Sequence, residues 1–137
     1  MQKLKIKKIV NKKNKEPIIC LTAYTKTIAQ IADKFCDIIL VVDSLGMFLH
    51  GMKTTKQVKI ESMILHGKTV KNSVKKSLVV VDMPYKTYKN KFIAYKNAKK
   101  LINTTKCDAV KLEGGKKISK IIKHLVKKKF QSWDMLV

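Results

Sequence analysis

The chain has 137 residues, of which 45% are hydrophobic, and a formal net charge of +22 at pH 7. This composition excludes a disordered chain, and no apolar stretch reaches the roughly 18 uncharged residues that a membrane span requires. The Lys-rich segment from Met1 to Lys15 is not followed by the apolar core of a secretory signal. We therefore expect a cytoplasmic globular protein with no membrane partner.

The positive charge has two interpretations. All 31 basic residues are lysine, although arginine supplies the bidentate contacts of specific nucleic-acid readers. The lysines are scattered along the chain. We therefore interpret the high lysine content as the compositional effect of an A+T-rich coding sequence, and we expect no specific nucleic-acid partner. A Lys-rich nucleic-acid-binding protein, with steeply salt-dependent affinity, remains the alternative from another class.

Apolar runs that are typical of buried strands alternate with helical stripes. In chain order we expect strand Ile18–Ala23, helix Ile28–Phe35, strand Asp37–Val42, helix Ile60–Lys71, strand Leu78–Val81, helix Ala94–Ile102, strand Ala109–Leu112 and helix Ile118–Val126. The first strand is expected to be buried on both faces. The first helix should bury Ile28, Ile31, Ala32 and Phe35, and residues 43–51 should form a loop. This alternation predicts an α/β fold with a parallel sheet.

Neither the cysteines nor the histidines indicate a zinc site. The cysteines lack CxxC spacing, and we expect them to be buried, reduced thiols: Cys20, Cys36 and Cys107. The histidines are expected to stand apart from one another: His50, His66 and His124.

Three acidic residues, Asp43, Asp82 and Glu113, each close an apolar run. A carboxylate just past a parallel strand faces the pocket in which barrel enzymes keep their chemistry. A curved barrel wall would bring the three toward one cation, whereas a flat doubly wound sheet would spread them along an edge. Carboxylate ligands suit Mg²⁺ better than zinc. The competing interpretation is that these acids cap loops or pair with lysines.

Four segments resemble successive signatures of the ketopantoate hydroxymethyltransferase family, in the same order and spacing. They are Leu21–Tyr24, Asp43–Met47, Val81–Tyr85 and Asp108–Gly115. Four motifs in register are far more specific than one short pattern. The resemblance implies the N-terminal portion of a (β/α)8 TIM barrel, here with four βα units. A closed barrel needs about 250 residues.

The resemblance also implies an activity, the transfer of a hydroxymethyl group from 5,10-methylenetetrahydrofolate to 3-methyl-2-oxobutanoate. The product, 2-dehydropantoate, would serve pantothenate and coenzyme A synthesis. Asp43 and Asp82 would bind Mg²⁺ and substrate, with Glu113 a further or water-mediated metal ligand. Ser44 and Lys111 would hold the keto acid. Intact family members form homo-oligomers. A Mg²⁺-dependent barrel enzyme acting on phosphoenolpyruvate or a related keto acid is the alternative.

The sequence departs from the family pattern in two respects. Val42 and Thr25 stand where the family has Gly and Asp, and the family's general-base glutamate matches no residue, so no catalytic base is assigned. Residues 131–137 show neither helix nor strand periodicity, whereas a reading frame moved back by one nucleotide gives a family-like strand. We hypothesise a frameshift that leaves a partial barrel, 1–130, and a non-family tail. We then expect an unpaired edge on the fourth strand and little or no transfer by the isolated chain.

Overall fold

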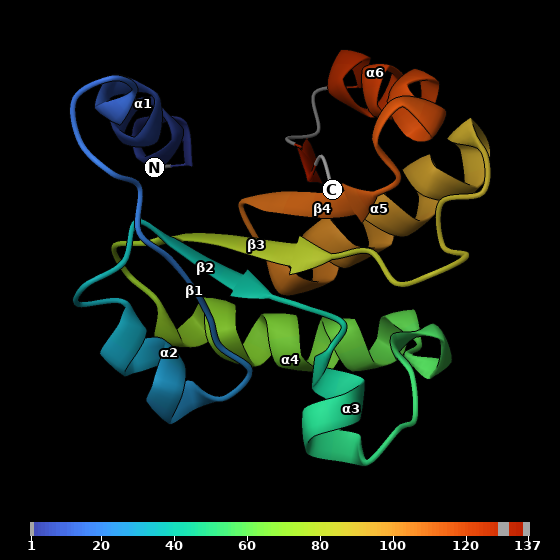
Figure 1. The fold of residues 1–137 in the computed structure, drawn as a ribbon, viewed down its shortest axis with the longest axis horizontal. Helices are drawn as coiled ribbons and strands as arrows, with labels where there is room; N and C mark the ends of the chain where they lie inside the picture. The colour runs from blue at the N-terminus through green and yellow to red at the C-terminus, as the bar shows by residue number, and fades with distance from the viewer. Residues whose placement is uncertain (1, 129–131, 136–137) are drawn as a thin grey trace.

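The computed structural model describes residues 2–128 and 132–135 and contains one parallel five-stranded sheet (Figure 1). The strands are β1 (Cys20–Thr22), β2 (Ile38–Val41), β3 (Leu78–Asp82), β4 (Ala109–Glu113) and β5 (Ser132–Met135). The α-helices are α1 (Gln2–Lys12), α2 (Lys26–Ala32), α3 (Leu45–His50), α4 (Ile60–Ser73), α5 (Lys91–Thr105) and α6 (Ser119–Lys127). Two 3₁₀ turns, η1 (Thr55–Gln57) and η2 (Gly115–Ile118), precede α4 and α6.

The strand order is β1-β2-β3-β4-β5, so strands that follow one another in the chain also lie side by side. A doubly wound sheet reverses its order at a switch point, and this sheet does not. Uninterrupted order with helical crossovers is the arrangement of a barrel wall. The expected α/β fold and its partial-barrel form are confirmed by this topology together with the structural likenesses reported below.

Alternation along the strands divides the sheet into two faces. Ile39, Val79 and Val110 face the main core, which α2, α4 and α5 cover. A second cluster on the other face joins Ile38, Leu78, Val80 and Ala109 to Ile6 and Ile9 of α1. Figure 1 shows α1 on the opposite side of the sheet from α2 and α4. Helix α1 was not expected from the sequence, and it covers part of this second face, which is the inner face of the partial barrel.

Helix α5 illustrates how the expected helices form. The Asn90 side chain accepts a hydrogen bond from the Ile93 backbone N–H at 2.9 Å, which satisfies one free donor of the first turn. Ala94, Ala98 and Leu101 are fully buried at helical spacing. Within the residues described, no helix is both long and apolar enough to cross a membrane.

The expectation that the first strand is buried on both faces is wrong. All residues of β1 are exposed, and Leu21 keeps 52% of its surface in solvent, because β1 lies at one edge of the sheet. Its Cys20 is therefore an exposed thiol, whereas Cys36 and Cys107 are buried as expected.

Helix α2 forms, but the expected buried stripe is only partly right. Ala29 and Ala32 are buried, whereas Ile28 and Ile31 on the helix and Phe35 just after it are exposed. The small alanine side chains allow α2 to pack closely, so the residues that touch the core are not the largest ones. The hydrophobic pattern alone could not distinguish these two faces.

Two segments expected to be irregular are regular. Residues 45–50, within the expected loop, form α3. The tail contributes β5, which pairs in parallel with β4 from Val110↔Ser132 to Glu113↔Met135. The expectation of an unpaired edge on the fourth strand is therefore wrong, because backbone pairing requires no periodicity of side chains. The boundary expected between residues 130 and 131 lies outside the described residues.

Asp33 holds the segment that enters β3. Its carboxylate accepts hydrogen bonds from the backbone N–H groups of Lys75, Lys76 and Ser77 at 2.7–3.2 Å. Partial burial raises the pKa of Asp33, but these backbone hydrogen bonds lower it by more, so the net shift is downward. A single carboxylate thus orders three successive donors.

Other carboxylates act at the same, amino-terminal edge of the sheet. Asp108 Oδ2 accepts from the Val79 backbone N–H at 2.9 Å and pairs with Lys71 Nζ at 2.5 Å. Asp37 Oδ2 accepts from the Ile19 backbone N–H at 2.9 Å. These contacts tie neighbouring strands together at the end of the sheet that is opposite to the acids singled out above.

We predict that Asp33→Asn lowers the free energy of unfolding at pH 7 by about 1–3 kcal/mol, because backbone donors lose a charged acceptor. The folded-state pKa is depressed, so the stabilisation is present above the unfolded-state pKa and is lost as pH falls through the folded-state pKa. Urea unfolding at pH 7 and pH 3 measures both effects. Glu61→Gln, which removes an exposed pair with Lys100, should cost less than about 1 kcal/mol. Equal losses for the two variants would contradict the assignment.

Candidate functional site

The inner face of the sheet changes character at the carboxyl ends of β3 and β4. Val80 and Ala109 are apolar, and two residues further along the same face stand Asp82 and Lys111, followed by Glu113. The parallel register places Asp82 directly opposite Lys111. Strand alternation therefore places two carboxylates and one ammonium group close together on the inner face.

Lys111 links the two acids. Its Nζ lies 2.6 Å from Asp82 Oδ2 and 3.1 Å from Glu113 Oε1. The side chains of Lys111 and Asp82 are 3% and 4% exposed, whereas that of Glu113 is 56% exposed. The backbone N–H of Asp43 also donates to Asp82 Oδ2, at 3.2 Å. The pair is thus buried, with its second acid at the solvent boundary.

Asp82 carries one unsatisfied oxygen. Its Oδ1 is buried and has no hydrogen-bond partner in the described part of the chain. Burial raises the pKa of Asp82 to about 6, although Lys111 and the Asp43 backbone N–H favour the charged form. For Lys111 burial lowers the pKa, but its bonds to Asp82 and Glu113 outweigh that effect, and the net shift is upward. Burial and the charge of Glu113 raise the pKa of Asp43.

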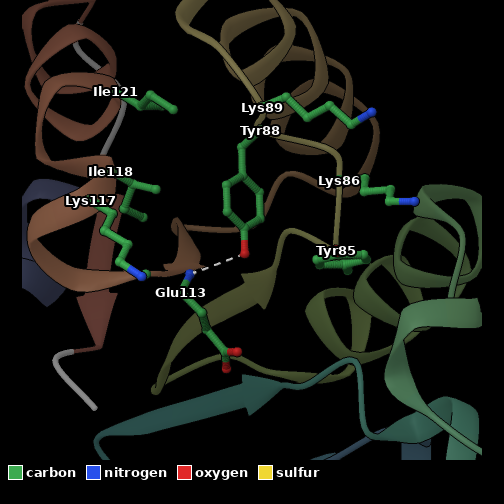
Figure 2. Close-up of a pocket in the computed structure, with 9 residues that line it drawn as sticks. Tyr85, Lys86, Tyr88, Lys89, Glu113, Lys117, Ile118 and Ile121 are labelled. Carbon is green, nitrogen blue, oxygen red and sulfur yellow. Dashed lines mark hydrogen bonds between the residues drawn. The ribbon is translucent and has the colours of Figure 1, made fainter.

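These groups border a cavity of about 190 Å³, hereafter the acid cavity. Its lining consists of Asp43, Thr55, Lys56, Asp82, Met83, Tyr85, Tyr88, Lys111 and Glu113. A larger hollow of about 570 Å³ adjoins it and shares Tyr85, Tyr88 and Glu113 (Figure 2). The hollow is further lined by Lys86, Lys89, Gly114, Lys117, Ile118 and Ile121.

Ser44 stands beside the acid cavity without lining it. It precedes α3, and its hydroxyl lies 2.8 Å from the Tyr24 hydroxyl. Two residues later, a β-carbon at Gly46 would overlap the Val58 side chain, so this glycine permits the close approach of α3 to the segment that leads into α4. The Asp-Ser-Leu-Gly motif is therefore packed tightly against its neighbours.

The expected cluster of three metal-binding acids is not formed. Asp43, Asp82 and Glu113 all line the acid cavity, but among the described residues no three His, Cys, Asp or Glu side chains stand close enough to hold a metal ion. The ammonium group of Lys111 lies between two of the acids, Asp82 and Glu113. Asp82 Oδ1 is buried and has no partner among the described residues, and a carboxylate oxygen of this kind is a suitable ligand for a hard cation.

Sequence reasoning missed several cavity residues. The Tyr88 hydroxyl accepts a hydrogen bond from the Glu113 backbone N–H at 3.4 Å, drawn as a dashed line in Figure 2. Lys56 lies with its Nζ 5.6 Å from the centre of the Tyr85 ring. Tyr85 lies within a recognised motif, which could have pointed to it, but Lys56 and Tyr88 lie outside the recognised segments.

The histidines do not all stand apart as expected. His50 at the end of α3 and His66 in α4 meet, with their Nε2 atoms 3.2 Å apart. Sixteen residues separate them in the chain, so sequence spacing gave no sign of this contact.

A family model described as ketopantoate hydroxymethyltransferase matches residues 3–131. Proteins named 3-methyl-2-oxobutanoate hydroxymethyltransferase are 57% identical over 125 residues in Pelagibacter ubique and 50% identical over 117 residues in Rhizobium etli. These alignments cover 91% and 85% of this chain but 49% and 43% of the relatives. The chain thus spans about half the length of the curated relatives it matches.

Solved structures with a similar fold include a 2,3-dimethylmalate lyase of the PEP mutase/isocitrate lyase superfamily and an oxaloacetate acetylhydrolase. Their TM-scores are 0.67 and 0.66 at 11% and 12% identity. The matches cover 95% and 93% of this chain, and 49% and 50% of those chains. At such identities the likeness shows the fold, part of a TIM barrel.

We predict that Lys111→Met lowers the free energy of unfolding by about 3–5 kcal/mol, because it leaves the buried Asp82 without its counter-charge. The double variant Lys111→Met/Asp82→Asn should recover most of that loss, since no buried charge is then left alone. Chemical unfolding of the two variants and of Lys100→Met, which breaks an exposed pair, measures the difference. A double variant as unstable as Lys111→Met would refute the pairing argument.

Proposed function

The chain belongs to the ketopantoate hydroxymethyltransferase family, and on this premise we propose that its acid cavity binds and activates 3-methyl-2-oxobutanoate. The reaction served is the transfer of a hydroxymethyl group from 5,10-methylenetetrahydrofolate to that keto acid, giving 2-dehydropantoate for pantothenate and coenzyme A synthesis. Relatives at 57% and 50% identity carry the corresponding name, which supports this reaction over one on phosphoenolpyruvate.

The buried Lys111–Asp82 pair is the observation that carries the proposal. Lys111 presents a fixed ammonium group to the acid cavity, and its two carboxylate partners keep it charged despite its burial. An ammonium group with little access to water attracts the carboxylate of a keto acid more strongly than an exposed one does. Lys111 would therefore orient the substrate by its carboxylate end.

Asp43 and Asp82 would hold Mg²⁺, with Glu113 acting through water. Asp82 Oδ1, which is buried and has no partner within the described residues, supports this assignment, and Mg²⁺ commonly uses one or two protein carboxylates together with substrate oxygens and water. When bound, the ion would withdraw electron density from the keto and carboxylate oxygens of the substrate and so acidify the neighbouring C–H. Asp43 fits this role because its side chain borders the same cavity.

Ser44 and the larger hollow complete the proposed arrangement. If Tyr24 donates its hydroxyl proton to Ser44, the Ser44 proton is free to donate to the keto acid. The hollow offers two tyrosine rings together with Lys86, Lys89 and Lys117, a combination that suits the aromatic and anionic parts of a folate.

Substrate binding and hydroxymethyl transfer are separable in this proposal. The acids that line the acid cavity are all assigned to the metal or to Lys111, so no lining residue is left as an obvious general base. We accordingly propose that the chain alone binds the keto acid but gives little or no transfer. Calorimetry with 3-methyl-2-oxobutanoate tests the first part, and an assay for 2-dehydropantoate tests the second.

We predict that Ser44→Ala weakens binding of 3-methyl-2-oxobutanoate about tenfold, the cost of one hydrogen bond to a charged group. Ser73→Ala provides the matched control, because the Ser73 hydroxyl donates to the Thr69 carbonyl at the end of α4 that leads into β3, at the opposite edge of the sheet from Ser44. Isothermal titration in the presence of Mg²⁺ measures both. Unchanged affinity in Ser44→Ala would remove Ser44 from the site.

We also predict that Mg²⁺ tightens keto-acid binding by the wild-type chain and that Asp43→Asn abolishes this enhancement. In the part of the chain that the structure describes, the Asp43 carboxylate makes no hydrogen bond or salt bridge, so the fold should survive the substitution. The measurement is the ratio of keto-acid affinities with Mg²⁺ and with a chelator. Equal ratios for the wild type and for Asp43→Asn would show that Asp43 does not bind the ion.

A further inference from the structure

We propose that His50 and His66 form a binding site for a divalent transition-metal cation, separate from the acid cavity. Their Nε2 atoms lie 3.2 Å apart, and the two rings meet edge to face with centroids 5.3 Å apart and planes at 62°. His50 is exposed at the end of α3, so a cation from solvent can reach it.

The distance between the two nitrogens fits shared coordination. Imidazole nitrogens lie about 2.0–2.1 Å from zinc, and two such ligands at a tetrahedral angle are about 3.3 Å apart. The Nε2 atoms of His50 and His66 therefore already have the separation of two ligands on one edge of a coordination polyhedron, and a turn of the rings would aim both lone pairs at one ion. Among the described residues no third His, Cys, Asp or Glu joins them, so water molecules would complete the shell.

The surroundings of His66 prepare it as a ligand. Its Nδ1 lies 2.9 Å from the Tyr24 backbone carbonyl oxygen, which can only accept a hydrogen bond. In the neutral ring Nδ1 therefore carries the proton, and the Nε2 lone pair points toward His50. Metal-binding histidines typically have their second ring nitrogen held in this way. Without a metal, His50 satisfies the lone pair by donating from its own Nε2.

The site would connect α3, which follows Ser44, to α4. Figure 1 shows α3 beside α4, and a cation held by both histidines would fix the end of the former to the middle of the latter. Tyr24 links this site to Ser44, since its carbonyl contacts His66 and its hydroxyl contacts Ser44. Imidazole ligands select Ni²⁺, Cu²⁺ and Zn²⁺ over Mg²⁺, so the two sites take different ions.

Titration of the purified chain with Ni²⁺ tests the proposal, and heteronuclear NMR follows the histidine rings. We expect one Ni²⁺ per chain, with the His50 and His66 ring signals perturbed and those of His124 unchanged. His50→Gln should weaken Ni²⁺ binding by at least about tenfold, because loss of a ligand should cost no less than loss of a second-shell partner. His124→Gln and Cys20→Ser, which alter a distant ring and an exposed thiol, should bind as the wild type does.

The Ni²⁺ titration is best carried out at about 0.15 M salt, where the Debye length of about 8 Å limits the repulsion of Ni²⁺ by the lysines. Three results would overturn the proposal. They are an absence of Ni²⁺ binding by the wild type, unchanged affinity in His50→Gln, and a loss of affinity in Cys20→Ser or His124→Gln equal to that in His50→Gln. The NMR measurement uses the wild type alone, so the proposal can still be tested if His50→Gln fails to fold.

Discussion

The buried pair between Lys111 and Asp82 is the interaction on which the candidate site depends. Parallel register places the two residues opposite each other, and alternation turns both to the inner face. A buried charge is tolerated only with a partner, so each residue requires the other. Lys111 bridges Asp82 and Glu113, and among the described residues the second Asp82 oxygen has no partner. The register between β3 and β4 therefore sets both the buried ion pair and the groups available for the proposed substrate binding.

Acidic residues of this lysine-rich chain form two groups at opposite edges of the sheet. Of its 9 acidic residues, those that anchor backbone donors and strand entries lie at one edge of the sheet and those of the proposed site lie at the other. The first group is Asp33, Asp37 and Asp108, and the second is Asp43, Asp82 and Glu113. Most lysines of the described residues are exposed, so their charges are solvated.

The sequence predicted the parallel α/β order and the strand ends that carry acids, because continuous apolar runs mark buried parallel strands. It could not predict the exposure of β1, since edge position depends on which strands pair with it. It did not predict which face of α2 is buried, because the buried residues there are small alanines while the larger isoleucines are exposed. Contacts between distant segments, such as His50 with His66 or Glu113 with Tyr88, have no local signal at all.

The free edge of β1 has a consequence for how the molecule behaves at different concentrations. An edge strand offers unpaired backbone donors and acceptors, and Leu21 on this strand and Ile28 and Ile31 on α2 are also exposed. Self-association through such an edge is coupled to folding by mass action. Where two copies associate through this edge, the melting temperature depends on protein concentration.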